Sequence, residues 1–256
     1  MKFRVMTYNV QHFHPYKASE QWDDIDYRPF ADAIKAFAPD VVGFNEIRGE
    51  GPSPIYAPQA ELIAGLTGYS YFYAPSLFIP DHGLYGNAFL CRKPLENAEV
   101  VHIPDPEGTT GYFESRSVAK TVLPYAGGIT MLTSHFGLRP VEAENAVRVV
   151  CDEIRKSPYP VILTGDFNVT PDNPVLDPIR ELLFDTAELF DRPLLSYPSD
   201  EPKVKIDYVF CSKDLHPTFA TIPPLVLSDH RPYIVDFELK SSFYYRKNRL
   251  FGGKKH

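Results

Sequence analysis

Short apolar segments recur along the chain and are separated by polar, proline-rich stretches. Segments 3–10, 40–47, 159–167, 204–212 and 231–239 are rich in β-branched and aromatic residues. A short apolar run bounded by turn residues indicates a buried strand. The pattern therefore predicts a strand in each of these five segments.

Four further segments predict strands that pair with a sequence neighbour. Residues 117–125 and 128–136 flank an Ala-Gly-Gly sequence, which is typical of a hairpin turn. Residues 69–75 and 87–92 also have strand composition, and we expect a loop between them. The segment Ser76–Leu90 around that loop is rich in aromatic and aliphatic groups. It either lines a substrate entrance or caps the edge of a sheet.

Three segments have apolar residues at helical spacing. Segment 30–38 ends before Pro39, and segment 58–68 ends at Gly68, a residue type that commonly terminates helices. Segment 140–157 begins with a proline and has one continuous apolar face, formed by Val141, Ala143, Ala146, Val147, Val150 and Ile154.

The order of these elements indicates an α/β protein with mixed β-sheets. Helices alternate with strands in places, whereas elsewhere several strands follow one another directly. This mixture argues against an all-parallel, doubly wound sheet. Two sheets packed face to face, with helices on the outside, fit the pattern without being required by it.

Length and charge favour one large acidic domain. The chain has 256 residues, 26 Lys and Arg against 33 Asp and Glu, and a formal charge of −7. Five of the basic residues and no acid lie in 241–256, so residues 1–240 carry a formal charge of −12. Such a charge argues against tight binding of duplex nucleic acid. The basic tail, 241–256, is either a frayed end or a surface or partner contact.

The cysteines and the N-terminus predict a cytoplasmic protein. Cys91, Cys151 and Cys211 are odd in number and widely spaced, as expected of reduced, buried thiols. The first residues do not resemble a signal peptide, and no apolar run approaches the ~20 residues of a membrane span.

Polar side chains recur at the ends of the predicted strands. Singly, each has an ordinary explanation as a turn residue, a solvated acid or a core histidine. As a set they are harder to dismiss, because carboxylates at the mouths of buried strands are costly unless they are paired or bind a cation. The set comprises Asn9, Glu46, His135, Asp166, Asn168, Asp207, Asp229 and His230.

The residue types in this set indicate a particular chemistry. Asn9, Glu46 and Asp229 offer hard oxygen ligands without a Cys–His cluster, which suits Mg²⁺ or Mn²⁺ rather than Zn²⁺. The two histidines and the remaining carboxylates indicate proton transfer and stabilisation of an anion.

The succession "TYN", "NE", "SH", "GDFN", "IDY" and "SDH" resembles the endonuclease/exonuclease/phosphatase superfamily, which has the DNase I-like fold. The resemblance runs from Thr7 to about Leu239, with "GDFN" and "SDHRP" as its most specific motifs. It implies a four-layer α/β sandwich of two mixed β-sheets with outer helices. It also implies hydrolysis of a phosphodiester or phosphomonoester with a divalent metal, and an active site at one end of the central sheets.

The resemblance further implies a role for each polar side chain. Glu46 matches the principal metal ligand, and Asn9 and Asp229 match groups beside the metal. The catalytic matches are Asp166 (water activation), Asn168 (positioning of that carboxylate and of the phosphoryl oxygens), His230 (transition-state stabilisation), Asp207 (orientation of His230) and His135 (phosphate contact).

Two positions need separate comment. Arg116 falls where several members place a phosphate-contacting arginine, and the alternative is an ordinary surface arginine on a strand. Asn45 stands where members commonly have glutamine before the metal-binding glutamate, which can alter the surroundings of the metal.

We therefore expect a metal-dependent phosphoesterase acting on a small or lipid-like phosphate ester. A DNA or RNA nuclease of the same fold is the alternative, and a binding module without catalysis is a third candidate. At the motif "GDFN", we expect Gly165 to let the backbone turn out of its strand and Phe167 to point into the packing between Asp166 and Asn168.

Overall fold

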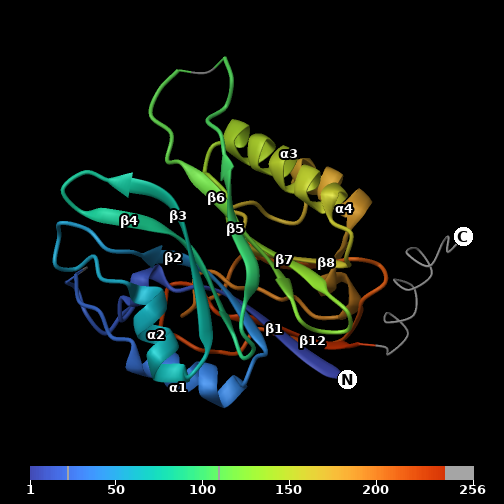
Figure 1. Ribbon diagram of the computed structural model, residues 1–256, viewed down its shortest axis with the longest axis horizontal. Helices are drawn as coiled ribbons and strands as arrows, with labels where there is room; N and C mark the ends of the chain where they lie inside the picture. Colours follow the sequence, from blue (N-terminus) through green and yellow to red (C-terminus); the bar gives the residue numbers. More distant parts are fainter. Residues whose placement is uncertain (22, 109, 240–256) are drawn as a thin grey trace, which may run out of the picture.

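The computed structural model describes residues 1–21, 23–108 and 110–239, and these residues form two mixed six-stranded β-sheets (Figure 1). The predicted tail at 241–256 and its boundary at residue 240 lie outside the described residues. The first sheet has the strand order β11 (His216–Thr221), β12 (Tyr233–Glu238), β1 (Lys2–Asn9), β2 (Val41–Arg48), β4 (Gly83–Cys91) and β3 (Ser70–Ile79). The second has the order β5 (Glu96–Ile103), β6 (Arg116–Leu123), β7 (Ile129–His135), β8 (Val161–Asp166), β10 (Asp207–Cys211) and β9 (Phe184–Asp185).

Helices cover the outer face of each sheet. In Figure 1, α1 (Arg28–Phe37) and α2 (Gln59–Thr67) lie against one sheet, and α3 (Pro140–Lys156) and α4 (Asp177–Leu182) lie against the other. Short 3₁₀ segments η1 (Gln11–Phe13), η2 (Pro174–Leu176) and η3 (Thr186–Leu189) complete the regular structure of the described residues. This is the four-layer α/β sandwich that the family resemblance implied.

Three apolar cores hold the four layers together. Between the sheets, Val5 and Val41 of one sheet share a cluster with Met131 and Ile162 of the other. The next residue along a strand faces the opposite way, so Val42 packs toward the outer helices with Phe30 and Ile34 of α1. Leu132 and Leu163 likewise pack with Val147 and Val150 of α3.

In the described part of the chain, two pairs of strands are parallel, and both lie at the centre of their sheets. β1 pairs with β2, and β7 pairs with β8, in the parallel sense. Because parallel strands end on the same side of a sheet, the carboxyl ends of all four strands lie at one end of the sandwich. The predicted polar side chains follow these ends.

Several sequence predictions are confirmed and some are wrong. The hairpin between β6 and β7 forms as predicted, and Gly68 ends α2 with a φ of 76°. The loop expected within Ser76–Leu90 is shorter than predicted. Strand β3 continues to Ile79 and β4 begins at Gly83, so only a short connection remains between them. Strands β5, β9 and β11 and helix α4 were not predicted, since their segments lack a clear apolar period.

The three cysteines are buried free thiols, as expected. In the described part of the chain, no helix has both the length and the apolar character needed to cross a membrane.

The expectation for Gly165 was right about the residue type and wrong about the reason. Gly165 lies within β8 with a φ of 143°, and the strand continues to Asp166. A Cβ atom at this position would lie 1.8 Å from the carbonyl oxygen of Ser134 on β7. The glycine is required because the two parallel strands approach each other closely just before the polar residues.

Replacing Gly165 by alanine tests this constraint. We expect Gly165→Ala to lower the free energy of unfolding by about 3 kcal/mol or more, because the new methyl group collides with backbone that cannot rotate away. The matched control is Gly65→Ala in α2, where an added Cβ meets nothing within 4 Å. It should be neutral or stabilising by up to about 1 kcal/mol. Urea unfolding of both variants measures the difference, and equal effects would contradict the assignment.

Candidate active site

The predicted polar side chains meet at the carboxyl ends of the central strands. Asn9 ends β1, His135 ends β7 and Asp166 ends β8, and His135 is in register with Asp166. Asp207 begins β10, rather than lying within a strand, and faces Asp166 across the antiparallel pair. The remaining members come from the residues around these strand ends: Glu46 from β2, Asn168 after β8, and Asp229 and His230 before β12.

A β-bulge turns Glu46 toward the site. The pairing of β2 with β4 shifts register between Phe44 and Ile47, and Glu46 has a φ of 61°. A glutamate in this left-handed region is strained, and such strain persists only where surrounding contacts impose it. The contacts are present, because Asn9 Nδ2 donates to Glu46 Oε1 at 2.9 Å and to Asp166 Oδ2 at 3.0 Å. One amide group thus links the carboxylates of the two sheets.

Tyr85 is a site residue that the sequence analysis missed. Its hydroxyl donates to Glu46 Oε2 at 2.8 Å, so both oxygens of this carboxylate are held by hydrogen bonds. The burial of the Glu46 carboxyl and the negative charge of Asp229 raise the pKa of Glu46. Tyr85 lies in the segment that was expected to be a loop. Its pairing in β4 is what brings it opposite the bulge.

Asn45 connects Asp166 to the first sheet. Its Oδ1 accepts a hydrogen bond from the backbone N–H of Asp166 at 2.9 Å, and its Nδ2 donates to Asn87 Oδ1 at 2.7 Å. Asn87 in turn donates to the carbonyl oxygen of Ser117 on β6 at 3.0 Å. All of these groups are buried, so the shorter amide at position 45 makes a complete bridge between the sheets.

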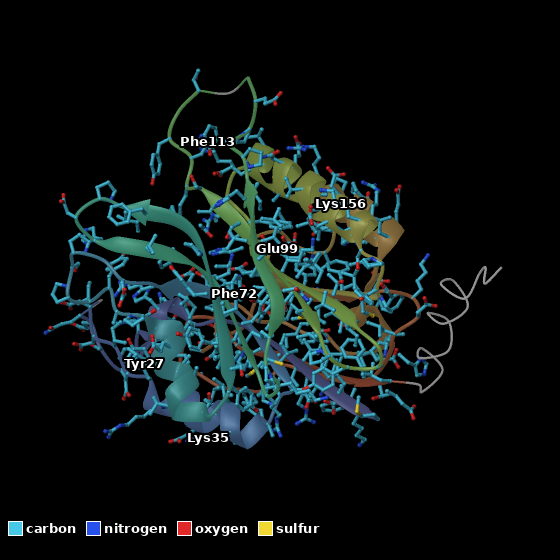
Figure 2. All side chains as sticks on the ribbon, in the orientation of Figure 1. Tyr27, Lys35, Phe72, Glu99, Phe113 and Lys156 are labelled. Atoms are coloured by element: carbon cyan, nitrogen blue, oxygen red, sulfur yellow. The ribbon has the colours of Figure 1, made fainter. Side chains whose placement is uncertain are left out.

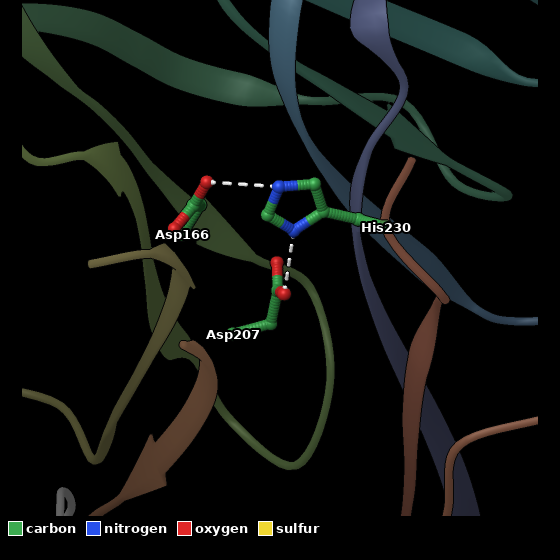
Figure 3. Close-up of side chains that lie close together, drawn as sticks. All are labelled: Asp166, Asp207 and His230. Carbon is green, nitrogen blue, oxygen red and sulfur yellow. Dashed lines mark hydrogen bonds and ion pairs between the residues drawn. The ribbon is translucent and has the colours of Figure 1, made fainter. Parts of the chain in front are cut away.

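Asp166, Asp207 and His230 form the tightest titratable cluster among the described residues (Figure 3). Asp207 Oδ2 lies 2.8 Å from His230 Nδ1, and Asp166 Oδ2 lies 3.5 Å from His230 Nε2. Although burial lowers the pKa of His230, the carboxylates of Asp207 and Asp166 outweigh it and raise that pKa above the ordinary value. Burial raises the pKa of Asp166, and the imidazolium opposes that rise.

His135 is held in the neutral form between two donor groups. Arg116 lies 3.0 Å from His135 Nδ1 and Asn168 Nδ2 lies 3.0 Å from Nε2, so both neighbours compete for the single acceptor nitrogen of a neutral imidazole. Burial and the positive charges of Arg116 and His230 lower the pKa of His135 well below 6.5. The Arg116 side chain is buried and pairs with Glu114 at 3.2 Å, so the surface-arginine alternative is wrong.

The motif around Asp166 has the expected internal arrangement. Phe167 is fully buried and stacks on Phe136 and Tyr208, with ring centroids 4.1 and 5.1 Å apart. Asn168 follows with a φ of 54°, and its Nδ2 lies 3.0 Å from His135 Nε2 and donates to the carbonyl of Phe136 at 2.9 Å. Asp166 Oδ1 accepts from the backbone N–H of Asn168 at 3.0 Å, which is the hydrogen bond of a simple turn. Asp166 therefore shapes the turn with one oxygen and faces both histidines with the other.

The site thus has a buried carboxylate between two imidazoles, at one end of a two-sheet sandwich. The sequence pattern described as the Endonuclease/Exonuclease/phosphatase family matches residues 6–230, and the chain belongs to this family. The family's members hydrolyse phosphate esters, including those of nucleic acids. No curated protein matches the chain in a sequence search.

Solved structures share the fold at low sequence identity. An endonuclease/exonuclease/phosphatase from Beutenbergia cavernae is 24% identical, with a TM-score of 0.74 over 93% of this chain and 72% of that one. A mannosyl-6-phosphatase from Bacteroides thetaiotaomicron is 18% identical, with a TM-score of 0.74 over 92% and 99%. A TDP2 from D. rerio, solved with a single-strand DNA product, is 19% identical, with a TM-score of 0.69 over 93% and 99%.

The role of Asp166 predicts a specific pH dependence. If the ionised carboxylate is needed, turnover falls as the pH falls through a pKa raised above the ordinary aspartate value of 3.8. Asp166→Asn should lower kcat at least ~10²-fold and remove this acidic limb. The melting temperature should stay within about 4 °C or rise, because a buried charge is removed. The measurement is kcat against pH for both proteins with saturating Mg²⁺, beside their thermal melts. Wild-type turnover in the variant would exclude Asp166 from the mechanism.

Proposed function

We propose that this protein is a divalent-metal-dependent phosphoesterase that hydrolyses a small phosphate ester by attack of water. The observation that carries the proposal is the position of the Asp166 carboxylate. One of its oxygens lies 3.5 Å from His230 Nε2 and 3.6 Å from His135 Nε2. A base for water and two imidazoles that can stabilise a phosphoryl group thereby lie around one carboxylate oxygen, an arrangement that suits phosphoryl transfer.

The donor set fits Mg²⁺ or Mn²⁺ at Glu46. Burial and the negative charge of Asp229 raise the pKa of Glu46, and a cation at this carboxylate would offset both effects. Asn9, Glu46 and Asp229 are the residues that would hold it. The cluster of Asp166, Asp207 and His230 suits a metal less well, because a protonated imidazole has no lone pair to offer. When bound, such an ion polarises a phosphoryl oxygen and offsets its developing charge.

The protein's own residues then divide the remaining tasks. Asp166 accepts a proton from the attacking water. His230, held by Asp207, presents a protonated Nε2 to the oxygen that gains charge, and neutral His135 contacts a phosphoryl oxygen beside it. Asn9 and Asn168 fix the carboxylate from two sides. Arg116 acts behind His135, where its positive charge helps to keep the imidazole neutral by lowering its pKa, after the larger effect of burial.

Charge and the structural neighbours bear on the substrate. The formal charge of −12 on residues 1–240 favours a small ester over duplex nucleic acid. One structural neighbour is a mannosyl-6-phosphatase, which supports a small phosphate ester. Another was solved with a single-strand DNA product, so a nuclease is the second candidate. The buried free thiols support our proposal that the enzyme works in the cytoplasm.

A substrate panel tests the proposed function. It comprises bis-p-nitrophenyl phosphate, single-stranded and abasic DNA, RNA and sphingomyelin, each assayed with Mg²⁺ and with a chelator. We expect bis-p-nitrophenyl phosphate to be hydrolysed, with a loss of at least about 10²-fold on chelation. Faster cleavage of a nucleic acid would favour the nuclease, and turnover that survives chelation would contradict the metal requirement.

Replacing Tyr85 tests the proposed metal ligand without relying on activity. Tyr85→Phe removes the hydroxyl that holds Glu46 Oε2 and preserves the ring. We expect Mn²⁺ affinity, measured by calorimetry, to fall about tenfold or more, as is common when a partner of a metal ligand is lost. Tyr159→Phe is the matched control, because Tyr159 precedes the start of β8 and Asp166, beside the site, ends that strand. Equal Mn²⁺ affinity in all three proteins would place the metal elsewhere.

A further inference from the structure

We propose that a cavity beside Asn168 binds the alcohol portion of the substrate, and that this portion is a neutral, hydroxylated group such as a sugar ring. The cavity has a volume of about 550 Å³ and lies between the first turns of α3 and the segment that follows β8. This volume is within the usual range for small-molecule sites. The assignment rests on the proposed function, because it extends the phosphate site.

Asn168 is shared by the cavity and the catalytic cluster. Asn168 is one of the residues that line the cavity, and its Nδ2 lies 3.0 Å from His135 Nε2. Its backbone N–H also donates to Asp166. A group esterified to a phosphate at Asp166 and His135 therefore has this cavity directly beside it.

The charges in the lining select for hydroxyl groups. Arg139 and Glu144 both line the cavity, and among the described residues neither side chain is engaged in an ion pair. A guanidinium only donates hydrogen bonds and a carboxylate only accepts them, whereas a hydroxyl does both. A second phosphate would be attracted by Arg139 but repelled by Glu144, and an amine the reverse, so neither gains from both charges. A purely alkyl group would desolvate both charges without replacing their hydrogen bonds.

The rest of the lining suits the carbon face of a ring. Leu138, Val169 and Pro174 supply apolar surface, and Leu138 is 79% exposed. A sugar ring has hydroxyls at its edge and C–H groups on its faces, so it matches a lining with two charges and an apolar floor. Burial of those C–H groups adds to binding in proportion to the area covered.

Arg139 is oriented before any ligand binds. Its guanidinium lies over the ring of Phe113, with the central carbon 4.9 Å from the ring centroid. Its backbone N–H donates to the Glu142 carboxylate at 3.0 Å, which fixes the start of α3. Figure 2 shows Phe113 on the loop between β5 and β6, at the end of α3 opposite Lys156. A stacked guanidinium loses less freedom on binding than a solvated one.

The test compares two esters that differ only in the alcohol. Glucose 6-phosphate is assayed against n-hexyl phosphate, and their p-nitrophenyl diesters are assayed if the enzyme cleaves diesters. We expect the wild-type kcat/KM to be at least about tenfold higher for the sugar ester. Glu144→Gln and Arg139→Met should each lower that ratio about tenfold, mainly by raising KM for the sugar ester, since each removes a charged hydrogen-bond partner. Asp152→Asn, at a half-buried acid further along α3 that pairs with Arg155, is the matched control and should leave both esters unchanged.

The possible failures are distinguishable. A wild-type ratio near one, or a ratio that neither substitution changes, would overturn the sugar subsite while leaving the phosphoesterase in place. Hydrolysis of none of these esters, nor of bis-p-nitrophenyl phosphate with Mn²⁺, would overturn the proposed function and this assignment with it.

Discussion

Negative charge buried at one end of the sandwich is the constraint on which the site depends. Asp166 and Asp207 are almost fully buried, and Glu46 and Asp229 are half-buried beside them. A carboxylate is expensive to remove from water unless a counter-charge or a proton accompanies it. His230 neutralises part of this charge, because its imidazolium lies between the carboxylates of Asp207 and Asp166. Among the described residues, neither Glu46 nor Asp229 forms an ion pair, and the charge of His230 is the smallest of the influences on the pKa of Glu46. We infer that a divalent cation supplies the remaining counter-charge.

The fold meets this constraint with backbone geometry that is locally unfavourable. Two parallel strand pairs place the polar residues at the same end of the sandwich. Residues with unusual φ values then orient individual side chains toward the site. Glu46 and Asn168 have φ values of 61° and 54°, and Gly165 allows β8 to approach Ser134 on β7. Residues of this kind persist where surrounding contacts impose them, and they are concentrated at functional sites. The hydrogen bonds of Asn9, Asn45 and Tyr85 are the contacts that impose them here.

Much of this arrangement could be predicted from the sequence, because apolar periodicity and strand-end polarity are local signals. Asn9 and Asp166 end apolar runs, and α3 is evident from its period. Tyr85 could not be found in this way, since its role depends on the pairing of β4 with the bulge at Glu46. The bridge through Asn45 and Asn87 likewise exists only once the two sheets face each other. Arg116 carried an ambiguous signal, which burial and the contact with His135 resolve. The short strands β9 and β11 are defined by their neighbours rather than by their own composition.

The central claim is that the two groups of carboxylates are neutralised differently, one by a proton on His230 and the other by a metal at Glu46. Anomalous diffraction from a crystal soaked in Mn²⁺ tests this division most directly. The account predicts a peak within coordination distance of Glu46, with Asn9 and Asp229 beside it. A peak centred between Asp166, Asp207 and His230, with none at Glu46, would contradict it.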